Sequence, residues 1–392
     1  MSKVKMNKVI LAYSGGLDTT FCAAYLKEKG HKVITATIDT GGFTQEELAE
    51  IEKRAVNAGS SKHYTVDVRE KIYEQVVQYV IKLNALYESD YPLMCADRYI
   101  ISQEAVAIAK KEKTNIVAHG STAVGNDQVR FDSALLMHKG IEILCPIKAL
   151  NITREEEQAY LEKRKIPIKI SSKKYSMNEN VFGVTISGSE IDNLKEPIDS
   201  YVLTKSHGNK KPAYIKIIFE KGVPVSLNGK KMPGLQILQK LNTIAGSYGY
   251  GKRIYTGDCI IGIKGHLLFE APGLMALIEA HRKLEQIILT KQQLRFNALA
   301  SDFWADLVYS AQYYDPLRQD IEAYADSVQE KVSGTVTLKV SENEVLAVAL
   351  ESKNSMINPG VATYAQKATW SAGDANGFIK LHSMQQKLVN RS

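Results

Sequence analysis

The chain has 392 residues, 44% of them hydrophobic and 24% charged, which is typical of a globular protein with two domains that each hold a sizeable core. Its net charge of +7 is spread along the sequence, so it suits anionic substrates and nucleic acid alike and excludes neither class of partner. No apolar run is long enough to span a membrane and residues 1–8 lack the apolar core of a signal peptide, so we expect a cytoplasmic protein.

The first predicted elements are a buried strand, a glycine loop and a helix. The apolar run Val9–Tyr13 leads into Ser14–Gly16, and the apolar face of a helix begins at Leu17. Two adjacent glycines let the backbone approach a ligand, and the free N–H groups at a helix start favour phosphate. The loop lacks the Walker A and dinucleotide signatures, whereas Ser-Gly-Gly-x-Asp resembles the PP-loop of the N-type ATP pyrophosphatases. We therefore favour a phosphate site over an ordinary turn between strand and helix.

Strands and helices alternate up to about residue 168. The predicted strands are Val9–Tyr13, Val33–Ile38, His63–Val68, Asn115–Ala118 and Ile143–Cys145. Capping boxes at Thr44 and Thr153 mark two of the helix starts. This alternation predicts an α/β domain, residues 1–168, with a parallel sheet, helices on both faces, and ligands at the carboxyl ends of the strands.

The pattern changes beyond residue 169. The predicted elements there are hairpins at Tyr214–Leu227 and Gly334–Leu350 and helices at Leu235–Ala245 and Met275–Ala298. They indicate an α+β domain, residues 169–365. The last segment, residues 366–392, carries a helical pattern at Phe378–Val389 with too few apolar residues for a core of its own. We expect this segment to dock onto another subunit.

A second polar loop, Ala118–Asp132, follows another predicted strand. Its backbone N–H groups and Thr122 suit a carboxylate, Asp127 suits an ammonium group, and Arg130 offers a planar fork to a second carboxylate. Such a loop can bind a zwitterion. A polar surface loop with a helix cap explains the same residues equally well.

Together the two loops resemble the argininosuccinate synthase family, and the resemblance extends over nearly the whole chain. The matching stretches are AYSGGLDTT (Ala12–Thr20), ALYE (Ala85–Glu88) with Tyr91, HGSTAVGNDQVRF (His119–Phe131), YSMNEN (Tyr175–Asn180), FEKGVPVSLNG (Phe219–Gly229), LNTIAGSYGYGKR (Leu241–Arg253) and LVYSAQYYDPLR (Leu307–Arg318). The resemblance implies an N-type ATP pyrophosphatase domain, an α+β synthetase domain and a C-terminal oligomerisation helix. It also implies an ATP-dependent ligase of arginine biosynthesis, usually a homotetramer.

The resemblance further implies three binding sites. The ATP site would contain Ala12, Tyr13, Ser14, Gly15, Gly16, Leu17, Asp18, Thr19, Thr20 and Gly120. The aspartate site would contain Thr122, Asn126 and Asp127, and the citrulline site Tyr91, Asn126, Arg130, Ser176 and Thr185. Ser14, Asp18, Asp127 and Arg130 would lie nearest the chemistry, with Mg²⁺ carried by ATP and no metal site on the protein. The ureido oxygen of citrulline would attack the α-phosphorus and release pyrophosphate, and the aspartate amine would then expel AMP.

Departures from the family pattern fall in the citrulline site. Pro92–Tyr99 is one residue shorter than in the family and keeps only its arginine. Gly257 stands where the family has a glutamate that contacts citrulline, and Phe269 replaces a tyrosine. Our hypothesis is that Asp258 or Asp97 substitutes for the lost carboxylate, or that the enzyme accepts an N-acylated citrulline, whose nitrogen is uncharged.

Two other functions compete with the ligase. A tRNA-thiolating PP-loop enzyme usually needs paired cysteines or zinc, and the spacing of Cys22, Cys95, Cys145 and Cys259 supplies neither. We therefore expect reduced, mostly buried thiols and no nucleic-acid substrate. An inactive nucleotide-sensing or RNA-binding scaffold is the third reading. His119 has no second ligand at metal spacing, so we expect a packed or hydrogen-bonded histidine.

Overall fold

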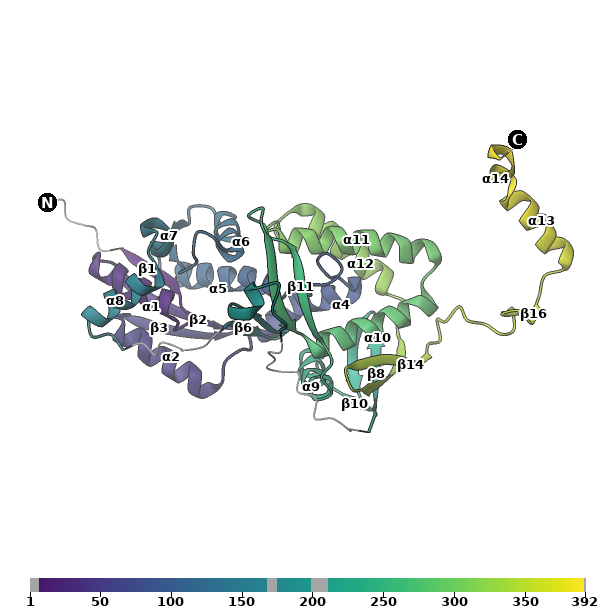
Figure 1. Cartoon of the computed structure of the whole chain (residues 1–392), viewed down its shortest axis with the longest axis horizontal. Coiled ribbons are helices and arrows are strands. Elements are labelled where there is room, and N and C mark those ends of the chain that lie inside the picture. The colour runs from purple at the N-terminus through teal and green to yellow at the C-terminus, as the bar shows by residue number, and fades with distance from the viewer. Residues whose placement is uncertain (1–6, 168–174, 199–210, 391–392) are drawn as a thin grey trace.

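The structure, a computed structural model, describes residues 7–167, 175–198 and 211–390 (Figure 1). Its first half contains a five-stranded parallel sheet in the order β3-β2-β1-β4-β5. The strands are β1 Lys8–Ala12, β2 Lys32–Asp39, β3 Lys62–Asp67, β4 Ile116–Ala118 and β5 Glu142–Leu144. Every predicted strand is confirmed with each end within one residue.

Helices cover both faces of this sheet. They are α1 Leu17–Glu28, α2 Gln45–Asn57, α5 Asp97–Lys111, α6 Asn126–Leu136, α7 Pro146–Leu150 and α8 Arg154–Lys163. Because side chains of a strand alternate between faces, Val9 packs with α1, α2 and α8, whereas Ile10 packs with α5. Both predicted capping boxes, at Thr44 and Thr153, are confirmed.

The strand order reverses its direction at β1. β1 lies between β2 and β4, so the chain runs outward in opposite directions on its two sides. The loops that follow β1 and β4 therefore start side by side at the carboxyl edge of the sheet and lead to helices on opposite faces, which is where ligands bind in folds of this type. These are the two loops that the sequence singles out.

The second half contains two antiparallel sheets, in the orders β10-β9-β8-β13-β14 and β11-β12-β7-β6. The strands are β6 Ser176–Asn180, β7 Gly183–Ser187, β8 Ala213–Glu220, β9 Val223–Leu227, β10 Lys230–Lys231, β11 Lys252–Asp258, β12 Lys264–Glu270, β13 Gly334–Ser341 and β14 Glu344–Glu351. The β8–β9 and β13–β14 hairpins confirm the two predicted ones. The β11-β12-β7-β6 sheet was not predicted.

One predicted helix is wrong. Met275–Ala298 is divided between α10 Pro272–Ile288 and α11 Lys291–Tyr309, because Leu289 is extended and Thr290 caps α11 in a capping box with Gln293. The other helices here are α9 Gly234–Gly246 and α12 Pro316–Gln329. The predicted Leu235–Ala245 helix is confirmed as α9.

The two halves share one hydrophobic core. The segment between β3 and α5 folds as α3 Arg69–Ile72, a π-helical turn Tyr73–Val77, α4 Gln78–Leu83 and a 3₁₀ turn Met94–Ala96. α4 packs against α10, α11 and α12 of the second half. Buried Glu285 on α10 joins them by accepting hydrogen bonds from Asn84 (2.6 Å), Asn297 (2.9 Å) and Gln329 (2.6 Å). Buried amides and a buried carboxylate thus satisfy one another between the halves.

The end of the described chain forms an arm, residues 352–390. It contains a short hairpin, β15 Ala362–Thr363 with β16 Lys367–Ala368, and two helices, α13 Ala372–His382 and α14 Met384–Val389. Figure 1 shows both helices well away from the rest of the chain, and none of their residues is buried. The predicted pattern Phe378–Val389 covers parts of both helices, which Ser383 separates. In the described part of the chain, no helix combines the length and apolar character that crossing a membrane requires.

Candidate active site

Side chains of α2 contact one side of the PP-loop and hold it in place. Gly15 has φ +73°, and a Cβ atom there would lie 2.8 Å from Ile51, so a close approach and a left-handed backbone both require glycine. The Arg54 guanidinium donates a 2.6 Å hydrogen bond to the Gly15 carbonyl. The loop therefore has a fixed shape before any ligand arrives.

The opposite side of the PP-loop is open. Gly16 precedes α1 and no side chain caps this helix, so the first N–H groups of α1 are available to an anion. The exposed Ser14 hydroxyl lies 3.3 Å from the Thr19 hydroxyl on this side. Tyr13 and Thr20, by contrast, are buried and bond to each other beneath the loop at 3.0 Å. Of the residues predicted for ATP, these two support the loop rather than face its open side.

A pair of carboxyl groups lies at the start of α1. Asp18 and Glu157, from α8, each have one buried oxygen that no donor from another described residue contacts. Burial and the neighbouring Asp18 carboxylate raise the pKa of Glu157 to about 8. A protonated Glu157 can donate a hydrogen bond to Asp18, so the two carboxyl groups satisfy each other beside the PP-loop.

The loop after β4 touches the PP-loop at Gly120. A Cβ atom on Gly120 would lie 3.2 Å from the Thr19 Cγ2 and 3.3 Å from the Thr19 backbone nitrogen. Next to it, His119 is buried and its Nε2 lies 2.8 Å from Asp132. His119 is thus hydrogen-bonded, as predicted, and the glycine permits the close contact between the two loops.

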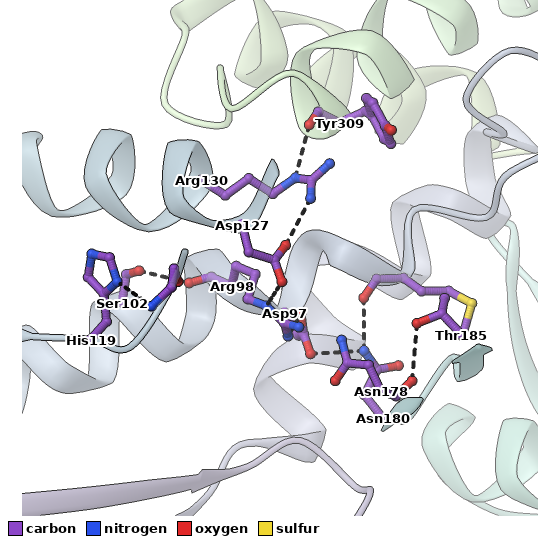
Figure 2. A network of polar contacts seen from close by, with 12 residues as sticks. Asp97, Arg98, Ser102, His119, Asp127, Arg130, Asn178, Asn180, Thr185 and Tyr309 are labelled. Carbon is purple, nitrogen blue, oxygen red and sulfur yellow. Dashed lines mark hydrogen bonds and ion pairs between the residues drawn. The ribbon is translucent and has the colours of Figure 1, made fainter. Parts of the chain in front are cut away.

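Two carboxylates and two guanidinium groups, from the first turn of α5 and from α6, form a chain of ion pairs (Figure 2). Arg98 contacts Asp97 at 2.7 Å and Asp127 at 2.9 Å, and Arg130 contacts the other oxygen of Asp127 at 3.0 Å. Although burial opposes the shift, the two guanidinium groups lower the pKa of Asp127. Asn180 of β6 donates to Asp97 at 2.9 Å and so ties the chain of ion pairs to the second half.

Arg130 has unused hydrogen-bonding capacity. Its Nε donates to the Tyr309 carbonyl at 3.0 Å, and its guanidinium lies 4.8 Å from the centre of the Tyr309 ring. Its Nη2 is buried and has no partner among the described residues. A buried, unpaired donor on a cation is suited to a ligand carboxylate or other anionic oxygen.

Aromatic side chains continue the site into the second half. Tyr91 is buried, and its ring lies 5.8 Å from Phe269 and 5.5 Å from Tyr255. Thr185 is the strand neighbour of Phe269, whereas Ser176 lies on the exposed part of β6. Asn126 reaches the same region, because its side-chain amide oxygen (Oδ1) accepts a 3.0 Å hydrogen bond from the Ile260 N–H. Thr122, on the exposed loop, stays a prediction without a described contact to these groups.

Glu88 lies in one of the stretches that match the family, but it was not assigned to the site from the sequence. The Glu88 side chain accepts hydrogen bonds from the Tyr255 hydroxyl at 2.6 Å and the Asp258 N–H at 3.2 Å. A Cβ atom on Gly257 would lie 1.8 Å from Glu88 Oε2, so Glu88 occupies the space beside the glycine. Nothing local in the sequence signals this, because Glu88 sits in a left-handed turn and reaches a strand about 170 residues later. The Gly257 site therefore does contain a negative charge.

The two substitutes suggested from the sequence do not fit that role. Asp258 follows Gly257 on β11, so its side chain points to the opposite face, where it pairs with Lys264. Asp97 is fully buried and already bound by Arg98 and Asn180. Neither aspartate therefore places a carboxylate beside Gly257.

Comparisons with known proteins give the same assignment as the motifs. The family model described as "Arginosuccinate synthase N-terminal HUP domain" matches residues 8–167, and "Arginosuccinate synthase C-terminal domain" matches residues 175–389. The chain belongs to the argininosuccinate synthase family. The resemblance, the PP-loop fold and the expectation of an ATP-dependent ligase are thereby confirmed.

Individual relatives of this family align from end to end. Argininosuccinate synthase of Xanthomonas campestris is 44% identical over 98% of this chain and 99% of its own. Those of Sulfurisphaera tokodaii and Pyrococcus furiosus are each 40% identical, over 98% and 97% of this chain and 99% and 94% of their own. A solved 4-thiouridine synthetase–RNA complex with bound ATP is 15% identical over 40% of each chain, with a TM-score of 0.30, too low to carry an argument.

The Asp18–Glu157 pair predicts a pH effect on ATP binding. Above about pH 8, Glu157 loses its proton and a second negative charge appears beside the phosphates. We expect the ATP dissociation constant, measured by calorimetry, to rise by about fivefold between pH 7 and 9, a cost near 1 kcal/mol. Glu157→Gln should remove this dependence, and Glu155→Gln, on the exposed side of the same helix, should retain it. An unchanged pH dependence in Glu157→Gln would contradict the assignment.

Proposed function

We propose that this chain is an argininosuccinate synthase, which joins L-citrulline and L-aspartate at the expense of ATP and releases AMP and pyrophosphate. The observation that carries the proposal is the loop from His119 to Asp127. Its start packs on the PP-loop, and its end supplies a carboxylate held by two arginines. One segment thus links a phosphate site to a site for amino-acid groups, as a ligase of this family requires. In this proposal the reaction is a step of arginine biosynthesis and takes place in the cytoplasm.

The PP-loop binds the β and γ phosphates of ATP in this proposal. Ser14, Gly15, Gly16 and Thr19 contribute N–H and hydroxyl groups, and Gly120 lies against the nucleotide. The Asp18 carboxyl group, at the start of α1, would suit Mg²⁺ carried by the nucleotide, since this ion prefers oxygen ligands and keeps several waters. Mg²⁺ would neutralise charge on the departing pyrophosphate. The remaining ATP residues, Ala12, Tyr13, Leu17 and Thr20, position the loop.

The amino-acid substrates occupy the cluster beyond this loop. Arg130, through its unpaired Nη2, binds the citrulline carboxylate, and Tyr91 and Thr185 line the same pocket with Asn126 and Ser176. Thr122, Asn126 and Asp127 bind aspartate. The ureido oxygen of citrulline attacks the α-phosphorus, and the aspartate amine then attacks the activated carbon. Alignment and charge neutralisation supply the acceleration, so no protein nucleophile is needed.

The acceptor is plain citrulline rather than an N-acylated one in this proposal. Glu88 provides a carboxylate where Gly257 lacks one, and it is exposed enough to meet an ammonium group. An N-acylated nitrogen carries no charge to pair with it. Binding of an N-acylated citrulline would leave the Glu88 carboxylate without an ammonium group to pair with.

Pyrophosphate release tests the reaction. It should require citrulline, and argininosuccinate should form only when aspartate is added. Asp18→Ala and Arg130→Ala should each lower the turnover rate by at least ~100-fold, because each removes a charged contact in a water-poor site. Arg282→Ala, an exposed arginine on α10, is the matched control and should keep full activity. Release without citrulline, or only with RNA, would refute the proposal in favour of another PP-loop enzyme.

Glu88 makes the acceptor testable. Glu88→Gln should raise KM for citrulline about tenfold, the equivalent of ~1.4 kcal/mol, and change kcat little. Gly257→Ala should act similarly, since its Cβ would displace the Glu88 carboxylate. Glu330→Gln, a distant exposed glutamate, should match the unaltered enzyme. A higher kcat/KM for N-acetyl- or N-succinylcitrulline than for citrulline would refute the choice of acceptor.

The arm, residues 352–390, supports assembly into a homotetramer. Its exposed apolar side chains include Trp370, Phe378, Ile379 and Leu381, each more than half exposed. Light scattering should give the mass of four chains for the full-length protein and a smaller mass when the chain ends at residue 355. Phe378→Ser with Leu381→Ser should act like the truncation. A monomeric full-length protein would refute this part of the proposal.

A further inference from the structure

A cysteine, a histidine and an aspartate meet beside the nucleotide loop, outside the substrate contacts proposed above. Cys145 directly follows β5 and its Sγ donates to the Ser121 carbonyl at 3.1 Å. The Ser121 N–H in turn donates to His119 Nδ1 at 3.3 Å, and His119 Nε2 lies 2.8 Å from Asp132. β4, α6 and the end of β5 thus bring together residues that are up to 26 positions apart in the sequence.

The charges around Cys145 favour its thiolate form. The groups that face it are His119 from the end of β4, Asp132 from α6 through His119, Lys148 from α7 and the neutral thiol of Cys22 from α1. Burial opposes both shifts, yet Asp132 and Cys145 raise the pKa of His119 to about 9, and His119 lowers the pKa of Cys145. The hydrogen bonds given above belong to the neutral pair, in which Cys145 Sγ donates and His119 Nδ1 accepts. Transfer of the thiol proton to His119 gives a thiolate and an imidazolium, which is the reactive form of cysteine.

The other buried thiols lack this environment. Burial raises the pKa of Cys22 well above its ordinary value and that of Cys95 to about 11. Cys145 and Cys95 are almost equally exposed, at 8% and 7%, whereas Cys22 is fully buried. Cys95 is therefore a reference with matched accessibility, and a difference in rate between Cys145 and Cys95 reports the neighbouring charges. The contrast makes Cys22 and Cys95 internal references for the reactivity of Cys145.

Cys145 contacts the loop after β4, which in turn packs against the PP-loop. Its sulfur is bonded to Ser121, the residue after Gly120, and Gly120 is already in close contact with Asp18 and Thr19. An atom added to the sulfur cannot keep the S–H···O bond to Ser121 and needs space that the carbonyl occupies. The loop must then move at Gly120, against the start of α1. Modification at Cys145 would therefore disturb the nucleotide site without touching it.

We propose that Cys145 is a modification site, at which a peroxide or a soft carbon electrophile reacts with the thiol and weakens nucleotide binding. With hydrogen peroxide, the thiolate sulfur attacks one oxygen, the O–O bond breaks and an S–OH bond forms. The second oxygen leaves with the electron pair of the broken bond and takes a proton from His119, giving water. Sulfur is oxidised to a sulfenic acid, peroxide is reduced, and a thiol reductant reverses the change. The proposal rests on nucleotide binding at the PP-loop but not on the identity of the acceptor.

Alkylation of the full-length protein with iodoacetamide tests the reactivity. The rate at each cysteine is measured by peptide mass spectrometry from pH 5 to 10. At pH 7 Cys145 should react at least ~10-fold faster than Cys22 or Cys95, with a midpoint below the ordinary thiol value of about 8.5. His119→Gln should move the midpoint upward, which a merely structural role of His119 would not do. Asp132→Asn should move it in the same direction if His119→Gln does not fold.

ATP binding is measured separately from turnover. A failure of the Cys145 proposal can then be distinguished from a failure of the ligase proposal. ATP binding, followed by calorimetry, should weaken after peroxide and recover with dithiothreitol. Cys145→Ser keeps a hydroxyl donor for Ser121 and should bind ATP normally before and after peroxide. Cys259→Ser, which removes the more exposed thiol, should remain sensitive. Equal labelling of Cys145 and Cys22, or loss of ATP binding in peroxide-treated Cys145→Ser, would overturn the proposal.

Discussion

The arrangement of the site depends on the chain of ion pairs from Asp97 through Arg98 and Asp127 to Arg130. Two carboxylates balance two guanidinium groups, so most of the buried charge is neutralised within the protein. The same contacts bind α5 to α6, and bonds to Asn180 and to the Tyr309 carbonyl extend them into the second half. The four charged groups all belong to the first half, and the second half adds one hydrogen bond at each end of the chain of ion pairs. Among the described residues, the buried Nη2 of Arg130 has no partner and can meet a ligand.

Strand order brings this charged cluster to the phosphate loop. Because β1 and β4 are neighbours although about 100 residues separate them, the loops that follow them meet at Gly120. The PP-loop is fixed from one side by Arg54 and touched from the other by this second loop. The proposed nucleotide site and the proposed amino-acid site would thus be bounded by the same packed residues, so a change in either loop would affect both.

The parallel sheet, the capping boxes and the two loops could be predicted because their signals are local. Apolar runs identify buried strands, and Thr44 with Glu47 identifies a helix start within four residues. The β11-β12-β7-β6 sheet was missed because strands such as Ser176–Asn180 are polar and partly exposed. The amphipathic pattern continues through Thr290, so it predicted one helix where the structure has two. Two contacts depend on the topology of the fold and have no local sequence signal. They are Glu88 with the strand at Gly257, and Cys145 with the loop at His119.

The contact between Glu88 and Gly257 has a consequence for the position of a charge in this site. A side chain at position 257 and the present position of the Glu88 carboxylate exclude each other, since any Cβ there would overlap the carboxylate oxygen. Glu88 can hold its present position only because residue 257 has no side chain. The missing side chain on β11 therefore determines where the Glu88 carboxylate lies, and a glycine in a binding site can act by admitting a neighbouring group rather than by leaving space for the ligand.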